Sequence, residues 1–127
     1  SIVVSWGEIQ YLVRYIGIDT PEVRPLQCWG KEATAANLAL VGGRTVRLVR
    51  DKSQTDRYGR LLRYVYVGES LVNAELARGG NGYAERWAPD VAQAEAIEAA
   101  EADAKLNKAG LWGVCWHWMA LPDIAKS

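Results

Sequence analysis

Residues 9–16 read Ile9-Gln10-Tyr11-Leu12-Val13-Arg14-Tyr15-Ile16, and residues 19–22 read Asp19-Thr20-Pro21-Glu22. The first stretch is rich in β-branched and aromatic residues, which favour a strand. On that strand Arg14 is expected to share one face with Leu12 and Ile16. Prolines at positions 21 and 25 then force a loop. The sequence therefore predicts a guanidinium on a strand and two carboxylates on the loop that follows it.

A second polar segment, Thr55-Asp56-Arg57-Tyr58-Gly59-Arg60, supplies another guanidinium. Guanidiniums pair with phosphate oxygens and offset the charge that develops on them. Carboxylates hold hard cations or activate water, so together these groups suit phosphodiester cleavage. Taken alone, each segment is typical of something simpler. Arg14 would be a solvated or ion-paired strand residue, residues 19–22 a turn or cap, and residues 55–60 a hairpin turn with Gly59 at positive φ.

The rest of the chain predicts strands first, one helix between them, and further helices towards the end. The expected strands are residues 2–4, 9–16, 45–49, 61–67 and 83–87; the expected helices are residues 31–41, a short one near 71–77, and a long one from 90 to about 108. Asp90 is the expected N-cap of the long helix, and Gly110 its C-terminal stop. This order predicts an α+β fold, a small barrel with helices packed outside it.

Length and composition limit the possible classes. A chain of 127 residues predicts one domain over residues 1–127, which ends in a Trp-rich tail at 113–127. No run is long enough to cross a bilayer, so no membrane partner is expected. Lys+Arg and Asp+Glu are both 15, which excludes a net positive field that attracts nucleic acid. Phosphate binding must then come from local charge placement or from a bound cation.

Two cysteines, Cys28 and Cys115, allow two interpretations. They are either free, buried thiols or a disulfide that joins distant parts of the chain in an oxidising compartment. The disulfide would favour a secreted or periplasmic protein. Neither the spacing nor the neighbours suggest a zinc site, because the single histidine, His117, lies in the Trp-rich tail.

Across residues 2–112, in order and without large gaps, the chain resembles the staphylococcal nuclease (thermonuclease) family. The resemblance rests on Val13-Arg14 through Asp19-Thr20-Pro21-Glu22, Gly30-Lys31-Glu32-Ala33, Asp51, residues 55–60, Leu71-Val72-Asn73, and Gly110-Leu111-Trp112. A lone Asp-Thr-Pro-Glu would be weak evidence, whereas the full ordered set is specific. It implies an OB-type five-stranded barrel with about three helices. It also implies a calcium-dependent endonuclease that hydrolyses phosphodiester bonds of DNA and RNA with low sequence specificity.

The resemblance assigns the catalytic and metal-binding roles by position. Arg14 and Arg60 resemble the two phosphate-binding catalytic arginines. Glu22 resembles the residue that activates or positions the attacking water. Asp19 and the backbone carbonyl of Thr20 resemble Ca²⁺ ligands, and Glu22 is expected to reach the cation through water.

Substrate contacts are implied for three further residues. Arg57 and Tyr58 resemble the positions that contact the terminal phosphate of a nucleotide. Tyr58 and Trp87 could stack on bases or pack into the protein, and packing is the expectation for Trp87. Glu85 falls near a position where the founding enzyme has a nucleotide-stacking tyrosine, so base contact there is not expected, and Trp87 is the candidate to replace it.

Two other departures from the family pattern bear on function. An Asp-Gly-Asp-Thr/Ser segment, whose second aspartate is a direct Ca²⁺ ligand, is expected before Ile2; this chain starts at Ser1, so that ligand and most of the first barrel strand are expected to be missing. The loop between Glu22 and Gly30 is also shorter than in the founding enzyme. Weak Ca²⁺ binding is therefore predicted.

Two alternatives to a nuclease remain open. The missing aspartate favours a non-catalytic OB-fold module that binds nucleic acid or protein, or a fragment that is inactive by itself. Against both, Arg14, Glu22 and Arg60 are all present. DNA and RNA are the expected partners, and no obligate protein partner is evident.

Overall fold

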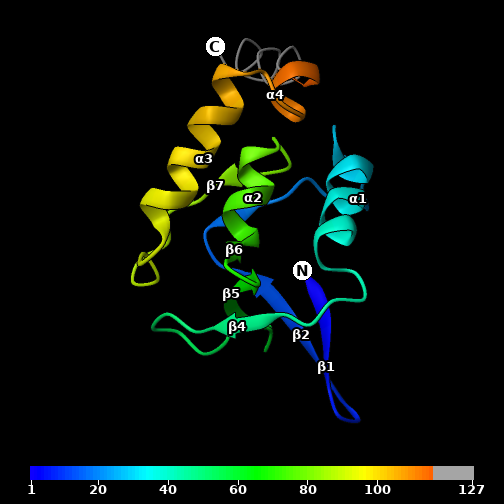
Figure 1. Ribbon diagram of the computed structural model, residues 1–127, viewed down its shortest axis with the longest axis vertical. Coiled ribbons are helices and arrows are strands. Elements are labelled where there is room, and N and C mark those ends of the chain that lie inside the picture. The colour runs from blue at the N-terminus through cyan, green and yellow to red at the C-terminus, as the bar shows by residue number, and fades with distance from the viewer. Residues whose placement is uncertain (116–127) are drawn as a thin grey trace.

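The computed structural model describes residues 1–115; in this range most strands come first, α1 lies between them, and the other helices follow towards the end, as expected for an α+β chain (Figure 1). The strands are β1 (Ile2–Trp6), β2 (Ile9–Tyr15), β3 (Ile18–Asp19), β4 (Arg47–Val49), β5 (Leu61–Val67), β6 (Ser70–Leu71) and β7 (Tyr83–Ala84). The helices are α1 (Gly30–Val41), α2 (Val72–Arg78), α3 (Ala94–Leu106) and α4 (Leu111–Val114). His117 and most of the predicted Trp-rich tail lie outside the described residues.

The main sheet has five strands in the order β1-β2-β5-β4, with β6 also paired to β5. β1 and β2 form an antiparallel hairpin, β2 pairs parallel with β5, and β4 pairs antiparallel with β5. β3 and β7 form a separate two-stranded sheet. The main sheet curls into a half-barrel beside the three longer helices. The predicted α+β class with an OB-type barrel is therefore confirmed.

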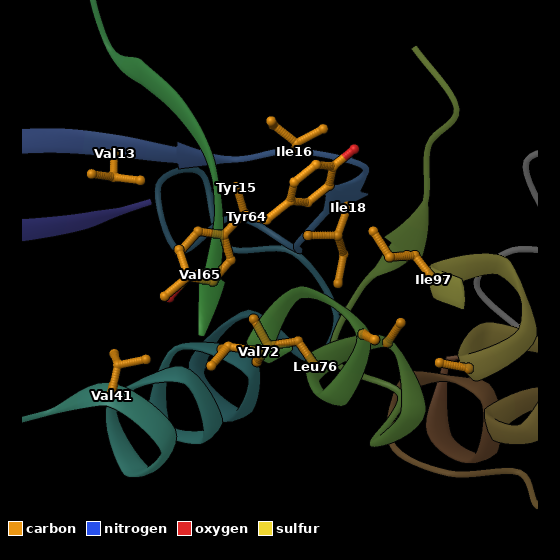
Figure 2. Packing of buried hydrophobic residues seen from close by; sticks show 13 residues of the cluster. Val13, Tyr15, Ile16, Ile18, Val41, Tyr64, Val65, Val72, Leu76 and Ile97 are labelled. Carbon is orange, nitrogen blue, oxygen red and sulfur yellow. The ribbon is translucent and has the colours of Figure 1, made fainter. Parts of the chain in front are cut away.

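The core lies between this sheet and helices α1, α2 and α3 (Figure 2). β2 and β5 contribute Val13 and Val65, α2 contributes Leu76, and α3 contributes Ile97. Each is almost fully buried, and burial of such a side chain contributes about 1.5–3 kcal/mol. No helix in residues 1–115 has the length and apolar character needed to cross a membrane.

A buried asparagine, Asn73 in α2, joins the helix to the two central strands. Its Nδ2 donates to the Ile16 carbonyl oxygen at 2.8 Å, and its Oδ1 accepts from the Val65 amide at 2.9 Å. The side chain is fully buried, so an unpaired amide there would be costly. These bonds fix the end of β2, where Arg14 lies, against β5, which begins directly after Arg60.

Some element boundaries differ from the sequence prediction. The helix expected from Asp90 begins at Ala94, and Asp90 does not cap it. Instead Asp90 is buried, and its Oδ1 accepts hydrogen bonds from the amides of Lys52 at 2.9 Å and Ser53 at 2.8 Å. The strands expected at 45–49 and 83–87 are shorter, as β4 and β7. β2 ends at Tyr15, so Ile16 is buried beyond the end of the strand.

A disulfide joins Cys28, just before α1, to Cys115, just after α4. The two residues are 87 positions apart in the sequence, and their Cα atoms are 6.0 Å apart. A cross-link that closes so long a loop contributes on the order of 4 kcal/mol in the chain-entropy model. The bond therefore stabilises the fold and also attaches the segment before α1 to the C-terminal end of the described chain.

Candidate active site

Arg14 lies on β2, which is paired on both sides. Its backbone is in register with Leu62 of β5, and the β1 hairpin pairs along the other edge. The guanidinium hydrogen-bonds to backbone carbonyl oxygens at the end of β2 and the start of β3. Its Nη1 donates to the Ile18 carbonyl oxygen at 2.7 Å and also to the Tyr15 carbonyl oxygen. Its Nη2 lies 3.7 Å from Oε2 of Glu85. Arg14 is therefore held in place while part of its guanidinium still faces solvent.

Arg60 ends a tight polar turn that is organised by Asp56. The Asp56 carboxylate accepts from the amides of Tyr58 at 2.9 Å and Arg60 at 3.0 Å, and from Nε of Arg60 at 2.6 Å. Gly59 has a φ of 82°, which a residue with a side chain rarely adopts. Partial burial opposes ionisation of Asp56, but these hydrogen bonds outweigh it and hold its pKa below the usual value of 3.8. Asp56 stays ionised and fixes the Arg60 guanidinium.

The two acidic candidates lie at the end of β3 and in the loop that follows it. Asp19 is in register with Tyr83 of β7, and Glu22 lies three residues later on an exposed loop. The Glu22 amide donates to Oε1 of Gln27 at 2.8 Å, and the Gln27 amide donates back to the Glu22 carbonyl oxygen at 2.9 Å. Neither bond uses the Glu22 carboxylate, which is left available for water or a cation.

Two cavities meet at the arginines. One, of about 370 Å³, is lined by Asp19, Thr20 and Glu22 together with Arg14 and Arg60. The structure therefore brings together all five residues to which the sequence assigned catalytic and metal-binding roles. Ser1 also lines this cavity.

The other cavity, of about 540 Å³, also has Arg14 and Arg60 in its wall. The remaining predicted substrate residues, Arg57, Tyr58 and Trp87, line it as well. A phosphodiester held by the two arginines would therefore face acidic residues on one side and aromatic rings on the other.

The aromatic side chains of the larger cavity are exposed. Tyr58 is 69% exposed and Trp87 is 66% exposed, so the expectation that Trp87 packs into the protein is wrong. The Arg57 and Arg60 guanidinium carbons lie 4.9 Å and 5.6 Å from the Tyr58 ring centroid, and Arg57 Nη2 donates to the Tyr58 hydroxyl at 2.7 Å. These contacts orient Tyr58 and leave much of it open to a base or a sugar.

Three contributing residues were not assigned by the sequence analysis. Asp56 lies inside the quoted motif, and its position four residues before Arg60 is the signal that could have identified it. Gln27 gives no such signal, because its bonds to Glu22 depend on the fold of the loop. Glu85 was noted only as a departure from the family pattern; its pairing with Arg14 joins the segment just after β7 to β2 and could not be read from spacing.

The donor set has the right chemistry for a hard cation but few charges. Asp19, Glu22 and backbone carbonyls offer oxygen ligands of the kind that Ca²⁺ prefers. Within residues 1–115, however, no group of three His, Cys, Asp or Glu side chains lies close enough together to hold a metal ion. The residues fit a hydrated, weakly held cation better than a fully protein-ligated one.

Comparisons with known proteins agree with this geometry. The model of the family described as "Staphylococcal nuclease homologue" matches residues 12–114. The thermonuclease of Staphylococcus hyicus is 37% identical over 116 residues, which cover 88% of this chain and 69% of that protein. The thermonuclease of Staphylococcus intermedius is 35% identical over 104 residues, 79% of this chain and 62% of that protein. The endonuclease YncB of Bacillus subtilis (strain 168) is 36% identical over 118 residues, 88% of this chain and 56% of that protein. The chain therefore spans only part of the length of each of these curated relatives.

Proposed function

This chain belongs to the staphylococcal nuclease homologue family, and on that premise we propose that it is an endonuclease that hydrolyses phosphodiester bonds of DNA and RNA with low sequence specificity. The observation that carries the proposal is the shared cavity of Arg14, Arg60, Glu22 and Asp19. Phosphate contacts position a nucleic acid without reading its sequence, and stacking on aromatic rings tolerates every base. Both kinds of contact are available here, which supports low specificity.

In the proposed reaction the Glu22 carboxylate accepts a proton from water, and the water oxygen attacks phosphorus. A bond from phosphorus to that oxygen forms, and the bond to the leaving sugar oxygen breaks. The leaving oxygen takes a proton from solvent. Arg14 and Arg60 bind the non-bridging oxygens and offset their growing negative charge. Because Asp56 and backbone carbonyls hold both guanidiniums before substrate arrives, little reorganisation is needed.

Calcium is the proposed cofactor. Its protein ligands would be the Asp19 carboxylate and the Thr20 carbonyl oxygen, with Glu22 acting through water and other waters completing the shell. When bound, such a cation would withdraw charge from the phosphate oxygens and make a bound water more acidic. With few protein carboxylates present, the proposed affinity is low.

Arg57, Tyr58 and Trp87 are proposed to hold the nucleotide next to the scissile phosphate. Arg57 would contact a phosphate, and the exposed rings of Tyr58 and Trp87 would stack on bases. Their positions in the wall of the 540 Å³ cavity support this assignment.

A second candidate function is a non-catalytic module that binds nucleic acid. Two observations favour it. The acidic donor set is small, and the ion pair with Glu85 partly neutralises Arg14. This alternative predicts binding of single-stranded oligonucleotides without cleavage at any calcium concentration.

The test is incubation of the purified chain with supercoiled plasmid and, separately, with RNA, first with calcium and then with excess chelator. The expected result is cleavage of both substrates with calcium and no cleavage with chelator. Binding without cleavage would support the second candidate instead. Cleavage that persists in chelator would contradict the calcium assignment while leaving the nuclease assignment in place.

We also propose an oxidising location, in the periplasm or outside the cell. The Cys28–Cys115 disulfide supports this, because such bonds persist where thiols are not kept reduced. Thiol titration of the unfolded, unreduced protein checks the bond in solution. Two free thiols would contradict the proposed location.

A further inference from the structure

The segment that carries Glu22, residues 20–30, is held by little apolar packing. Between the buried residues Pro21 and Gly30, its residues are exposed or half-buried, and Leu26 is 59% exposed. A segment with so few buried contacts opens easily. A group that activates water must nevertheless be held in its productive position. Contacts other than core packing therefore have to fix this segment.

The first set of contacts is local. The two hydrogen bonds between Glu22 and Gln27 close the loop on itself. The Gly30 amide then donates to the Gln27 carbonyl oxygen at 3.0 Å, which attaches the loop to the first turn of α1. These bonds shape the loop but connect it only to α1, and they lie close to solvent.

The second contact is the Cys28–Cys115 disulfide. Its partner outside the loop, Cys115, is held by burial and by a hydrogen bond. Cys115 is buried, and its amide donates to the Leu111 carbonyl oxygen at 2.6 Å. Leu111 is fully buried, and its own amide donates to the Gly80 carbonyl oxygen at 2.9 Å. The bond therefore joins the loop to a buried residue just after α4, a helix that is fixed against the turn after α2.

The third contact lies next to the disulfide. The indole Nε1 of Trp29 donates to Oδ1 of Asn81 at 2.9 Å, and Asn81 is buried. The Asn81 amide donates in turn to the Leu76 carbonyl oxygen at 2.9 Å in α2. Trp29 has a φ of 69°, unusual for a residue with a side chain, so the backbone is strained at this junction. Adjacent residues thus attach the loop to two points of the helical layer.

We infer that the Cys28–Cys115 disulfide, assisted by the Trp29–Asn81 hydrogen bond, is the device that positions Glu22. The inference rests on the proposed nuclease function. Neither arginine depends on this device, since Arg14 is held by β2 and carbonyl oxygens and Arg60 by Asp56. Reduction of the disulfide would leave phosphate binding intact and free the water-activating carboxylate. The site is then active in oxidising surroundings and impaired in reducing ones.

The test compares oxidised wild-type protein, the same protein after reduction, and Cys28→Ser, by steady-state kinetics and by amide hydrogen exchange. Trp29→Phe removes the indole N–H donor and keeps the disulfide. Val41→Ala, a buried change at the opposite end of α1, is the control for a general loss of stability. All assays are run well below the unfolding midpoint of each protein, so that each is fully folded.

Reduction and Cys28→Ser are expected to lower kcat by about ten- to hundredfold with little change in KM, since small misplacements of reacting groups have effects of that order. Amides of residues 22–27 should exchange faster, while those of β2 and β5 should not. Trp29→Phe should cause a smaller change in the same direction, and Val41→Ala should leave kcat unchanged.

Unchanged exchange at residues 22–27 after reduction, or faster exchange spread evenly over the chain, would overturn the inference. An equal loss of kcat in Val41→Ala would overturn it too. If the oxidised protein cleaves no nucleic acid, the proposed function fails, and the exchange data still decide whether the disulfide holds the loop.

Discussion

Arg60 is fixed by Asp56, a residue only four positions away, so the contact that holds it lies within the motif of residues 55–60. Asp56, Tyr58 and Arg60 belong to one short turn whose hydrogen bonds are local. Arg14 differs, because its partner Glu85 lies just after β7, far away in the sequence. A local motif can therefore contain both members of an ion pair, as with Asp56 and Arg60. The partner of Arg14 depends on the fold and cannot be read from a local motif.

Removal of the Glu85 carboxylate should strengthen substrate binding. In Glu85→Gln, Arg14 no longer has a competing anion, so its guanidinium is freer to bind phosphate. Exposed ion pairs contribute about 0.2–1 kcal/mol, which predicts a KM for a short oligonucleotide that is lower by about 1.5- to 5-fold. Glu69→Gln, in the exposed turn before β6, is the matched control and should leave KM unchanged. A higher KM in Glu85→Gln would mean that Glu85 binds the substrate.

The bounds of helices and strands were predicted well where neighbouring residues in the sequence determine them. β5 has the bounds predicted from its apolar run, and α1 starts one residue before its prediction and ends at Val41 before two glycines. The two-residue strand β3 was missed because only its distant partner β7 makes it a strand. The equally short β6 pairs with the end of β5 across a tight turn and runs directly into α2, so its residues gave no separate strand signal. The start of α3 was wrong because the amides of Lys52 and Ser53, which no local pattern reveals, bind Asp90 instead.

The first turn of α1 should tolerate no side chain at Gly30. A Cβ atom there would overlap the carbonyl oxygen of Glu22, so the Glu22 segment would have to move. Gly30→Ala is therefore expected to lower kcat by about tenfold or more, although alanine is the better helix former. Lys31→Ala, an exposed change one residue later, controls for helix propensity. Full activity of Gly30→Ala would show that the position of Glu22 is not critical.

At the scale of the whole molecule, the site is assembled from parts that no periodicity places together. The sheet supplies Arg14, a turn before β5 supplies Arg60, and an exposed loop supplies Glu22. Their convergence was predicted only through the resemblance to a family, because hydrophobic patterns fix elements and not their arrangement. The disulfide, the Asn73 hydrogen bonds and the Asp90 contacts are among the long-range connections that hold this assembly.

Asp90 should make the stability of the fold depend on pH. Burial opposes its ionisation, but hydrogen bonds from Ser53 and Lys52 outweigh burial and hold its pKa below the usual value of 3.8. A depressed pKa means that its contribution is fully present above that value and is lost as pH falls through the folded-state pKa. Urea denaturation should show Asp90→Asn less stable than wild type at pH 6, by about 1–3 kcal/mol, and little different near pH 2.

The exposed Asp103→Asn is the control for Asp90→Asn, because Asp103 pairs with Arg78 on the surface and should contribute little. A difference between Asp90→Asn and wild type that stays constant from pH 6 to pH 2 would mean that the charge on Asp90 does not stabilise the fold.

The most direct test of the account is the turnover of Arg60→Ala in calcium on plasmid DNA, beside wild type and Arg78→Ala. Arg78 is a surface arginine paired with Glu75 and Asp103, so Arg78→Ala controls for the loss of one positive charge. Because charge stabilisation is among the largest catalytic effects, Arg60→Ala is expected to lose at least about a hundredfold in kcat while Arg78→Ala keeps wild-type activity. A loss of less than about tenfold in correctly folded Arg60→Ala would contradict the proposal that Arg60 stabilises the transition state of phosphodiester cleavage.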